Sequence, residues 1–222
     1  MQNGDLARSI EHTLLGADAQ ESDVDRVCGE AARYGTLGVC LFPYYVGRAR
    51  KLLENTKVRI GTVVAFPFGC TWTDVKEDEM LSAAKLGADE IDCVINVSQL
   101  KSGNLGQVEE EMKRLKEVGR ESGLTTKFII ETAYLTKDEK LAIIEIANRV
   151  RPDFIKTSTG FAPIGARRDD VELLRGLLLP EVGIKAAGGI RNYRQAFALL
   201  EAGASRLGTS ASIDIMRGAT TE

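Results

Sequence analysis

Eight short apolar runs alternate with longer segments whose apolar residues recur at helical spacing. We interpret these runs as strands at residues 10–14, 38–42, 59–66, 90–96, 127–132, 153–157, 183–187 and 206–209. Most of the runs are continuously apolar rather than alternating. This pattern is typical of parallel strands that are covered on both faces.

Helical patterns fill the spaces between several of these strands. They cover residues 24–34, 73–86, 105–121, 136–150 and 194–201. Ser22 and Asp23 are placed to cap the first helix, and Thr136 with Glu139 has the spacing of a capping box. Strand–helix alternation repeated eight times predicts a (β/α)₈ barrel, with a doubly wound open sheet as the alternative. We expect one domain over residues 1–222, because no linker or low-complexity tract interrupts the pattern.

Composition narrows the function classes. The chain has 222 residues, 44% hydrophobic and 27% charged, with a net charge of −3, which gives no electrostatic reason to expect nucleic acid as a partner. No apolar stretch reaches the length of about 20 residues that spans a membrane. The first residues lack the features of a signal peptide, so we expect a cytoplasmic protein. The single histidine, His12, excludes a His-rich metal site, and no metal is expected.

Two lysines stand in the middle of apolar runs, where a charged side chain is costly. Lys156 lies in F-I-K-T-S and Lys185 in V-G-I-K-A-A, on the sixth and seventh predicted strands. Neighbouring strands are about 4.8 Å apart, so two inward-pointing lysines would lie close together. Burial and a second cation both lower the proton affinity of an amine, which yields a nucleophile that attacks carbonyl carbon. The alternative is that one lysine points outward between helices.

Asp92 is the third candidate, in the fourth predicted strand between Ile91 and Cys93. A buried carboxylate needs a partner, and a lysine across the barrel mouth would provide one. A purely structural ion pair is the alternative. Glu131 and Glu11 occupy similar positions on the fifth and first strands.

Glycine-rich segments follow the last three predicted strands. They contain Gly160 after the sixth strand, Gly188 and Gly189 after the seventh, and Gly208 with Ser210 at the eighth. Loops after strands seven and eight of this barrel often bind phosphate through backbone N–H groups, and glycine allows the close approach. Together these segments predict a phosphate site, although each glycine alone would also suit a tight turn.

Eight blocks of the chain resemble the deoxyribose-phosphate aldolase family, in family order. They are E-H-T-L-L at 11–15, V-V-A-F-P-F-G at 63–69, G-A-D-E-I-D at 87–92, L-K-S-G-N at 100–104, I-I-E-T at 129–132, F-I-K-T-S-T-G-F at 154–161, G-I-K-A-A-G-G-I-R at 183–191 and G-A-S-R-L-G-T-S at 203–210. The blocks around Lys156 and Lys185 are the most specific.

The resemblance implies an aldehyde-lyase that forms a Schiff base and needs no cofactor. Its expected reaction is the reversible cleavage of 2-deoxy-D-ribose 5-phosphate to D-glyceraldehyde 3-phosphate and acetaldehyde, in deoxyribonucleoside catabolism. Lys156 would form the imine, Lys185 would lower its proton affinity, and Asp92 would transfer protons with Lys185. The resemblance places the substrate phosphate at Gly160, Gly188, Gly189, Gly208 and Ser210. It also implies a homodimer or homotetramer.

Some positions depart from the family pattern. Glu11 stands where the family usually has aspartate, and residues 162–166 replace an expected glycine-rich stretch, which leaves the shape of that loop open. Two other functions remain as alternatives. One is a phosphate-binding barrel isomerase or synthase that forms no imine, and the other is a non-catalytic barrel that binds a phosphorylated metabolite.

Overall fold

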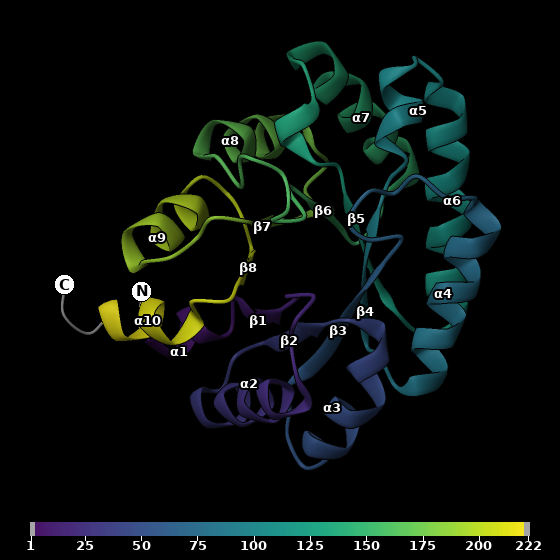
Figure 1. The fold of residues 1–222 in the computed structure, drawn as a ribbon. Helices are drawn as coiled ribbons and strands as arrows, with labels where there is room; N and C mark the ends of the chain where they lie inside the picture. The colour runs from purple at the N-terminus through teal and green to yellow at the C-terminus, as the bar shows by residue number, and fades with distance from the viewer. Residues whose placement is uncertain (1–2, 220–222) are drawn as a thin grey trace.

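Eight parallel strands close into a barrel in the computed structural model, which describes residues 3–219 (Figure 1). Each strand pairs with the next along the chain, and β8 pairs with β1. The strands are β1 (Ile10–Leu14), β2 (Gly38–Leu41), β3 (Arg59–Val64), β4 (Glu90–Val94), β5 (Thr125–Ile129), β6 (Phe154–Lys156), β7 (Gly183–Ala187) and β8 (Arg206–Thr209). The predicted (β/α)₈ barrel is confirmed, and the open sheet is excluded.

Helices surround the barrel on the outside, and α1 and α10 lie beside each other near the two termini (Figure 1). The helices are α1 (Asn3–Ala7), α2 (Glu21–Tyr34), α3 (Val46–Leu52), α4 (Thr73–Leu86), α5 (Val97–Lys101), α6 (Leu105–Glu121), α7 (Lys137–Val150), α8 (Arg168–Leu177), α9 (Tyr193–Glu201) and α10 (Ser212–Gly218), with 3₁₀ turns η1 (Pro43–Tyr45) and η2 (Thr132–Tyr134). The sequence pattern did not predict α1, α3, α5, α8 or α10.

Capping explains where two of these helices begin. The predicted capping box of α7 is present, because Thr136 and Glu139 bond each other's backbone N–H groups. The predicted cap of α2 is wrong: the helix begins at Glu21, and Asp23 bonds back to the backbone N–H of Gln20 at 3.1 Å. Asp23 is therefore inside the first turn, where its charge also suits the helix dipole.

The apolar core lies between the sheet and the helices rather than inside the barrel. Alternate strand residues such as Ile91 and Cys93 point outward into this core and are 2% exposed or less. The intervening residues point inward, and at the centre of the barrel many of them are charged. The fold thus separates an apolar outer layer, which gives most of the stabilisation, from a polar interior.

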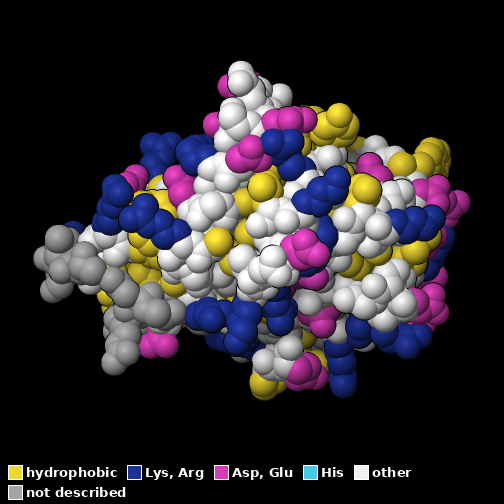
Figure 2. Space-filling view, turned by 90° about the horizontal axis from the view of Figure 1, so that it is seen from below, with side chains coloured by type: hydrophobic (Ala, Val, Ile, Leu, Met, Phe, Trp, Pro, Cys, Tyr) yellow, Lys and Arg dark blue, Asp and Glu magenta, His cyan; other side chains and the backbone are white. Residues whose placement is uncertain are grey.

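The surface carries mixed charge. Figure 2 shows basic and acidic side chains interspersed on one face, with hydrophobic side chains scattered between them. Within residues 3–219, no helix is long and apolar enough to cross a membrane.

Gly119 is the point of closest contact between α6 and the sheet. A Cβ built at Gly119 would lie 2.2 Å from Cγ2 of Thr126 on β5. We expect Gly119→Ala to lower the free energy of unfolding by about 1–3 kcal/mol, because the helix must move away from the strand. Gly106→Ala on the same helix, where nothing lies within 4 Å, is the control and should leave stability within about 1 kcal/mol of wild type in urea titrations. Equal stability of the two variants would contradict this packing.

Candidate active site

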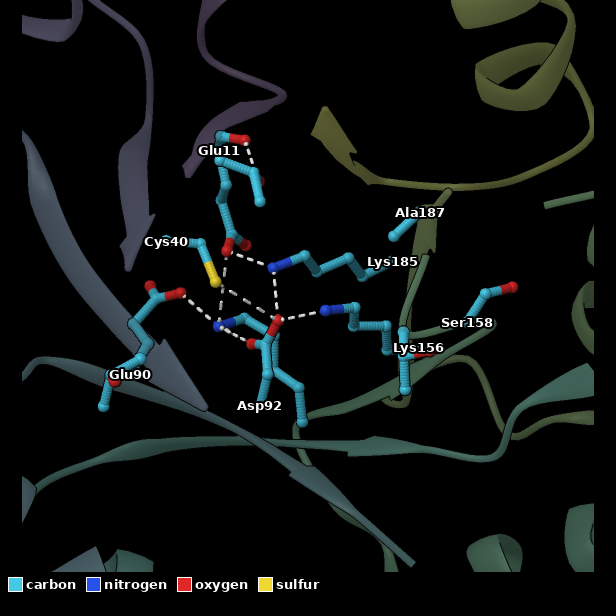
Figure 3. A network of polar contacts seen from close by, with 12 residues as sticks. Glu11, Cys40, Glu90, Asp92, Lys156, Ser158, Lys185 and Ala187 are labelled. Carbon is cyan, nitrogen blue, oxygen red and sulfur yellow. Dashed lines mark hydrogen bonds and ion pairs between the residues drawn. The ribbon is translucent and has the colours of Figure 1, made fainter. Parts of the chain in front are cut away.

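One carboxylate gathers three lysines inside the barrel. Asp92 Oδ2 accepts hydrogen bonds from Lys156 Nζ at 2.7 Å and from Lys185 Nζ at 2.6 Å. Its other oxygen, Oδ1, accepts one from Lys127 Nζ at 2.9 Å. Figure 3 shows the Lys156 and Lys185 side chains converging on Asp92 from one side. All four residues are 2% exposed or less.

Strand register brings these side chains together. Lys156 pairs with Lys185 across β6 and β7, and Asp92 pairs with Lys127 across β4 and β5. Paired residues in parallel strands point to the same face, so all four side chains enter the barrel. Glycines leave space for them: a Cβ at Gly208 would lie 3.0 Å from the Lys185 Cε, and one at Gly61 would lie 3.7 Å from a Glu11 oxygen.

A second set of charges lies below this cluster. Lys185 also donates to Glu11, and Lys127 also donates to Glu90 at 2.6 Å. Arg206, the first residue of β8, contacts Glu90 at 2.5 Å and Glu11 at 3.3 Å. The network therefore continues without interruption from Asp92 to the N-terminal end of the barrel.

The charges fix one another's ionisation. Burial by itself would raise the pKa of Asp92, but the charges of Lys127, Lys156 and Lys185 hold it well below its usual value. Burial likewise opposes ionisation of Glu90, and the charges of Lys127 and Arg206 overcome it and lower the pKa of Glu90 to about 2. The pKa values of Lys185 and Lys127 are raised, because Asp92 and Glu11 outweigh the effect of burial. Both of these lysines hold their protons firmly.

A cavity of about 380 Å³ opens at the C-terminal end of the barrel, and Lys156 is the one lysine of the cluster that lines it. Lys185 and Lys127 are fully buried beneath it. The five residues predicted to bind phosphate also line this cavity: Gly160, Gly188, Gly189, Gly208 and Ser210. The structure thus brings Lys156, at the base of the cavity, together with every predicted phosphate-binding residue.

The glycine loops fit closely against each other. Gly188 has φ +86°, and a Cβ there would lie 3.0 Å from the Gly165 Cα and 3.2 Å from the Gly160 Cα. Ala166 donates its N–H to the Ala187 carbonyl, so residues 162–166 close onto the β7 loop despite their departure from the family pattern. Gly188 and Gly189 both have positive φ and carry backbone N–H groups on the loop that lines the cavity. Backbone N–H groups beside a cavity are suited to binding an anion.

The other acidic and basic candidates have partners outside the cluster. Glu131, which is 3% exposed, accepts hydrogen bonds from the N–H and Oγ1 of Thr159 and does not join the lysines. His12 lies between Glu30 and Ser212 at 2.8 and 2.9 Å.

Sequence reasoning missed Lys127, Glu90 and Arg206, because each stood at or near the beginning of a predicted strand. One signal was present for Glu90. It is two residues before Asp92, and side chains two apart on a strand share a face.

One group of potential metal ligands exists within the described residues, and its ligand atoms are already engaged. Glu11, Cys40 and Asp92 have ligand atoms within 4.8 Å of one another. Lysine ammonium groups bond both carboxylates. Burial raises the pKa of the Cys40 thiol to about 11, so it remains protonated at neutral pH. A metal ion would have to displace a lysine here.

The model of the DeoC/LacD family of aldolases matches residues 9–218. The chain belongs to this family. It is 44% identical to the deoxyribose-phosphate aldolase of Aciduliprofundum boonei, over 97% of each chain, and 46% identical to that of Streptococcus pneumoniae, over 96% of each. Among solved structures, it superposes with a TM-score of 0.93 on the tetrameric deoxyribose phosphate aldolase of Aeropyrum pernix, at 30% identity, over 99% of this chain and 93% of the other. The chain is therefore an aldolase, a carbon–carbon lyase.

The buried carboxylates make stability depend on acid pH. The pKa of Glu90 falls from 4.5 to about 2 on folding, so its stabilisation is present above about pH 4.5 and is lost as pH falls toward 2. We expect the free energy of unfolding to decrease over this range by a few kcal/mol from this group, measured by urea titration at successive pH values. Glu90→Gln should give a shallower slope. Glu172→Gln, at an exposed ion pair with Arg168, should keep the wild-type slope. Parallel slopes for all three proteins would contradict the assignment.

Proposed function

We propose that this aldolase forms a Schiff base through Lys156 and reversibly cleaves 2-deoxy-D-ribose 5-phosphate to D-glyceraldehyde 3-phosphate and acetaldehyde. One observation in particular supports Lys156, rather than Lys185 or Lys127, as the lysine that forms the Schiff base. Lys156 lines the cavity, whereas Lys185 and Lys127 are sealed below it. The curated relatives named above support the substrate, since they carry the name deoxyribose-phosphate aldolase.

The barrel interior holds more cationic side chains than carboxylates. The interior holds three carboxylates, Glu11, Glu90 and Asp92, and four cations, Lys127, Lys156, Lys185 and Arg206. With every group ionised, one buried positive charge has no counterpart, which is unfavourable in a low-dielectric interior.

The lysines differ in how many carboxylates they contact. Lys127 Nζ lies within 4 Å of three carboxylates and Lys185 Nζ within 4 Å of two. Lys156 contacts only Asp92, and it shares that oxygen with Lys185. Lys156 is therefore the lysine with the fewest carboxylate partners, and a neutral amine is the form that attacks an aldehyde.

The reaction proceeds through covalent catalysis. The neutral Lys156 amine adds to the aldehyde carbon C1 to give a carbinolamine, and transfer of a proton from the site to its hydroxyl group expels water and leaves a protonated imine. This cation accepts the electron pair of the C2–C3 bond as a base removes the proton from the C3 hydroxyl. Glyceraldehyde 3-phosphate leaves and an enamine remains on Lys156. Protonation of the enamine at C2 and hydrolysis of the imine then release acetaldehyde and the free amine.

Asp92 and Lys185 are the groups proposed to move these protons. Both lie in the hydrogen-bonded cluster with Lys156, and Asp92 Oδ2 is 2.7 Å from the reacting nitrogen. The carboxylate stabilises the protonated imine, and the Asp92–Lys185 pair exchanges protons with the substrate through water. The Lys185 ammonium, held by two carboxylates, keeps a positive charge beside Lys156.

The substrate phosphate is proposed to bind the glycine-rich loops. Gly160, Gly188, Gly189, Gly208 and Ser210 all line the cavity. Backbone N–H groups of these loops would donate to phosphate oxygens. No cofactor or metal takes part in this mechanism.

Three further expectations belong to the same proposal. The tetrameric structure of the Aeropyrum pernix relative supports a homo-oligomer, a dimer or a tetramer, for this chain. A phosphorylated sugar does not cross membranes unaided, which supports a cytoplasmic location. The closed barrel supports one domain over residues 1–222.

The imine is directly testable by reductive trapping. We expect incubation with acetaldehyde and borohydride to add one two-carbon unit to Lys156, located by intact mass and peptide mapping. Lys156→Ala should show no adduct and should lose at least about 10³-fold in kcat, because covalent catalysis is removed. Lys113→Ala, at an exposed ion pair, is the matched lysine control and should keep full activity. A folded wild-type protein without an adduct would favour a non-covalent isomerase or synthase, or a non-catalytic binding protein.

The phosphate site makes a separate prediction. Gly188→Ala introduces a Cβ between Gly160 and Gly165 at positive φ, so the loops must separate. We expect KM for deoxyribose 5-phosphate to rise about 10-fold or more, while kcat/KM for unphosphorylated deoxyribose changes less than about threefold. Gly103→Ala is the control, because it has a similar φ of +76° but lies outside the cavity. Equal loss on both sugars would place the phosphate elsewhere.

A further inference from the structure

Arg206 is a partly buried permanent charge that the proposed reaction does not use. Its side chain is 11% exposed, and it does not line the cavity. Its guanidinium contacts Glu90 Oε2 at 2.5 Å and Glu11 Oε1 at 3.3 Å. It also lies over the Phe154 ring, with its central carbon 4.2 Å from the ring centre. Since guanidinium does not lose its proton in proteins, this charge is present at every working pH.

The position of the Phe154 ring depends on a glycine. A Cβ at Gly183 would lie 2.4 Å from the Phe154 ring, so any larger residue there would push the ring aside. The ring in turn supports one face of the Arg206 guanidinium by a cation–π contact. The arginine is thus oriented on one side by an aromatic face and on the other by two carboxylates.

We propose that Arg206 controls the protonation state of Lys156. Arg206 pairs with Glu11 and Glu90, and without it the negative charge of these carboxylates would balance a third lysine ammonium. Besides Arg206, Glu11 pairs with Lys185 and lies 3.7 Å from Lys127, and Glu90 pairs with Lys127. With Arg206 in place, three carboxylates face four cations, and one lysine is surplus. Without it, three carboxylates face three lysines, and all three ammonium groups are compensated. Arg206 is therefore a positioning residue, and it acts through Glu11, Glu90 and Asp92.

Few other charged groups near Lys156 could affect its protonation. Asp92 on β4 contacts it directly, Lys185 on β7 and Lys127 on β5 contact the same carboxylate, and Glu11 on β1 pairs with those two lysines. Cys40 on β2, with Sγ 3.8 Å from Asp92, is an uncharged thiol at neutral pH. Around Arg206, the remaining cation is Arg59, which bonds Glu90 from β3 but is 49% exposed, so solvent screens most of its charge.

This inference rests on the proposed role of Lys156, but it can be tested without aldolase turnover. The probe is acetic anhydride, which acylates only neutral amines, at low concentration across about pH 5 to pH 11, with Lys156 acetylation quantified by peptide mapping. The labelling midpoint reports the protonation of Lys156 in the folded protein. The pH profile of kcat/KM for deoxyribose 5-phosphate is measured in parallel.

In Arg206→Met we expect the midpoint and the acidic limb of kcat/KM to move to higher pH by about one unit or more, which is about 10-fold less neutral amine at a given pH below the midpoint. Activity should recover toward wild type at high pH. Arg206→Lys, which keeps the charge, should have a profile closer to wild type.

The double variant Arg206→Met with Glu90→Gln separates charge from structure. It leaves two carboxylates against three lysines, so one lysine is surplus again. We expect its midpoint to return to within about half a unit of wild type, although it removes one more native interaction. A purely structural role predicts the opposite, since two losses should damage the site more than one.

Specific outcomes overturn the proposal. An unmoved midpoint in folded Arg206→Met would do so, as would a double variant that moves further from wild type. If Arg206→Met does not fold, Glu90→Gln alone must move the midpoint to lower pH, and an unmoved midpoint there would refute the idea. A wild-type protein that labels as expected but forms no imine would instead refute the proposed function and leave the charge inference standing.

Discussion

The buried carboxylate of Asp92 is the constraint on which the rest of the barrel interior depends. A charge with no exposure is stable only if polar partners compensate it, and Asp92 has three lysine Nζ atoms within 2.9 Å. Those lysines in turn need further carboxylates, which Glu11 and Glu90 supply. The interior of this barrel is therefore one coupled electrostatic unit, and changing any member alters the protonation of the others.

Such an interior has a structural consequence. The long Lys185 side chain reaches the centre beside Gly208, where a Cβ on the neighbouring strand would lie 3.0 Å from the Lys185 Cε. Barrel interiors of this type are usually filled with layers of branched apolar residues, which contribute to stability. Here the stabilising apolar contacts lie outside the sheet, where clusters of buried residues connect strands to helices. The apolar contacts between the helices and the sheet thus supply the stabilisation that a charged interior does not.

The sequence predicted the fold and the lysines for the same physical reason. Apolar runs as long as a barrel strand predicted the eight strands. A charged residue within such a run is buried, so it needs a partner of opposite charge. Lys156, Lys185 and Asp92 met that criterion. Lys127, Glu90 and Arg206 did not, because at the beginning of a strand a charged residue is usually in solvent. Helices such as α8 were missed because their apolar residues follow an irregular loop that masks where the period begins.

The three lysines of the site differ in their depth in the barrel and in the number of carboxylates around them. Each lysine carries the same chemical group, yet the number of carboxylates within 4 Å of the amine falls from three at Lys127 to two at Lys185 and one at Lys156. The two lower lysines hold their protons, and the uppermost lines the cavity where a carbonyl compound can enter. In the proposed function, the nucleophilic lysine and the two lysines that only balance carboxylate charge are thus distinguished by depth in the barrel. The sharing of one Asp92 oxygen by Lys156 and Lys185 then couples the amine that lines the cavity to the charges beneath it.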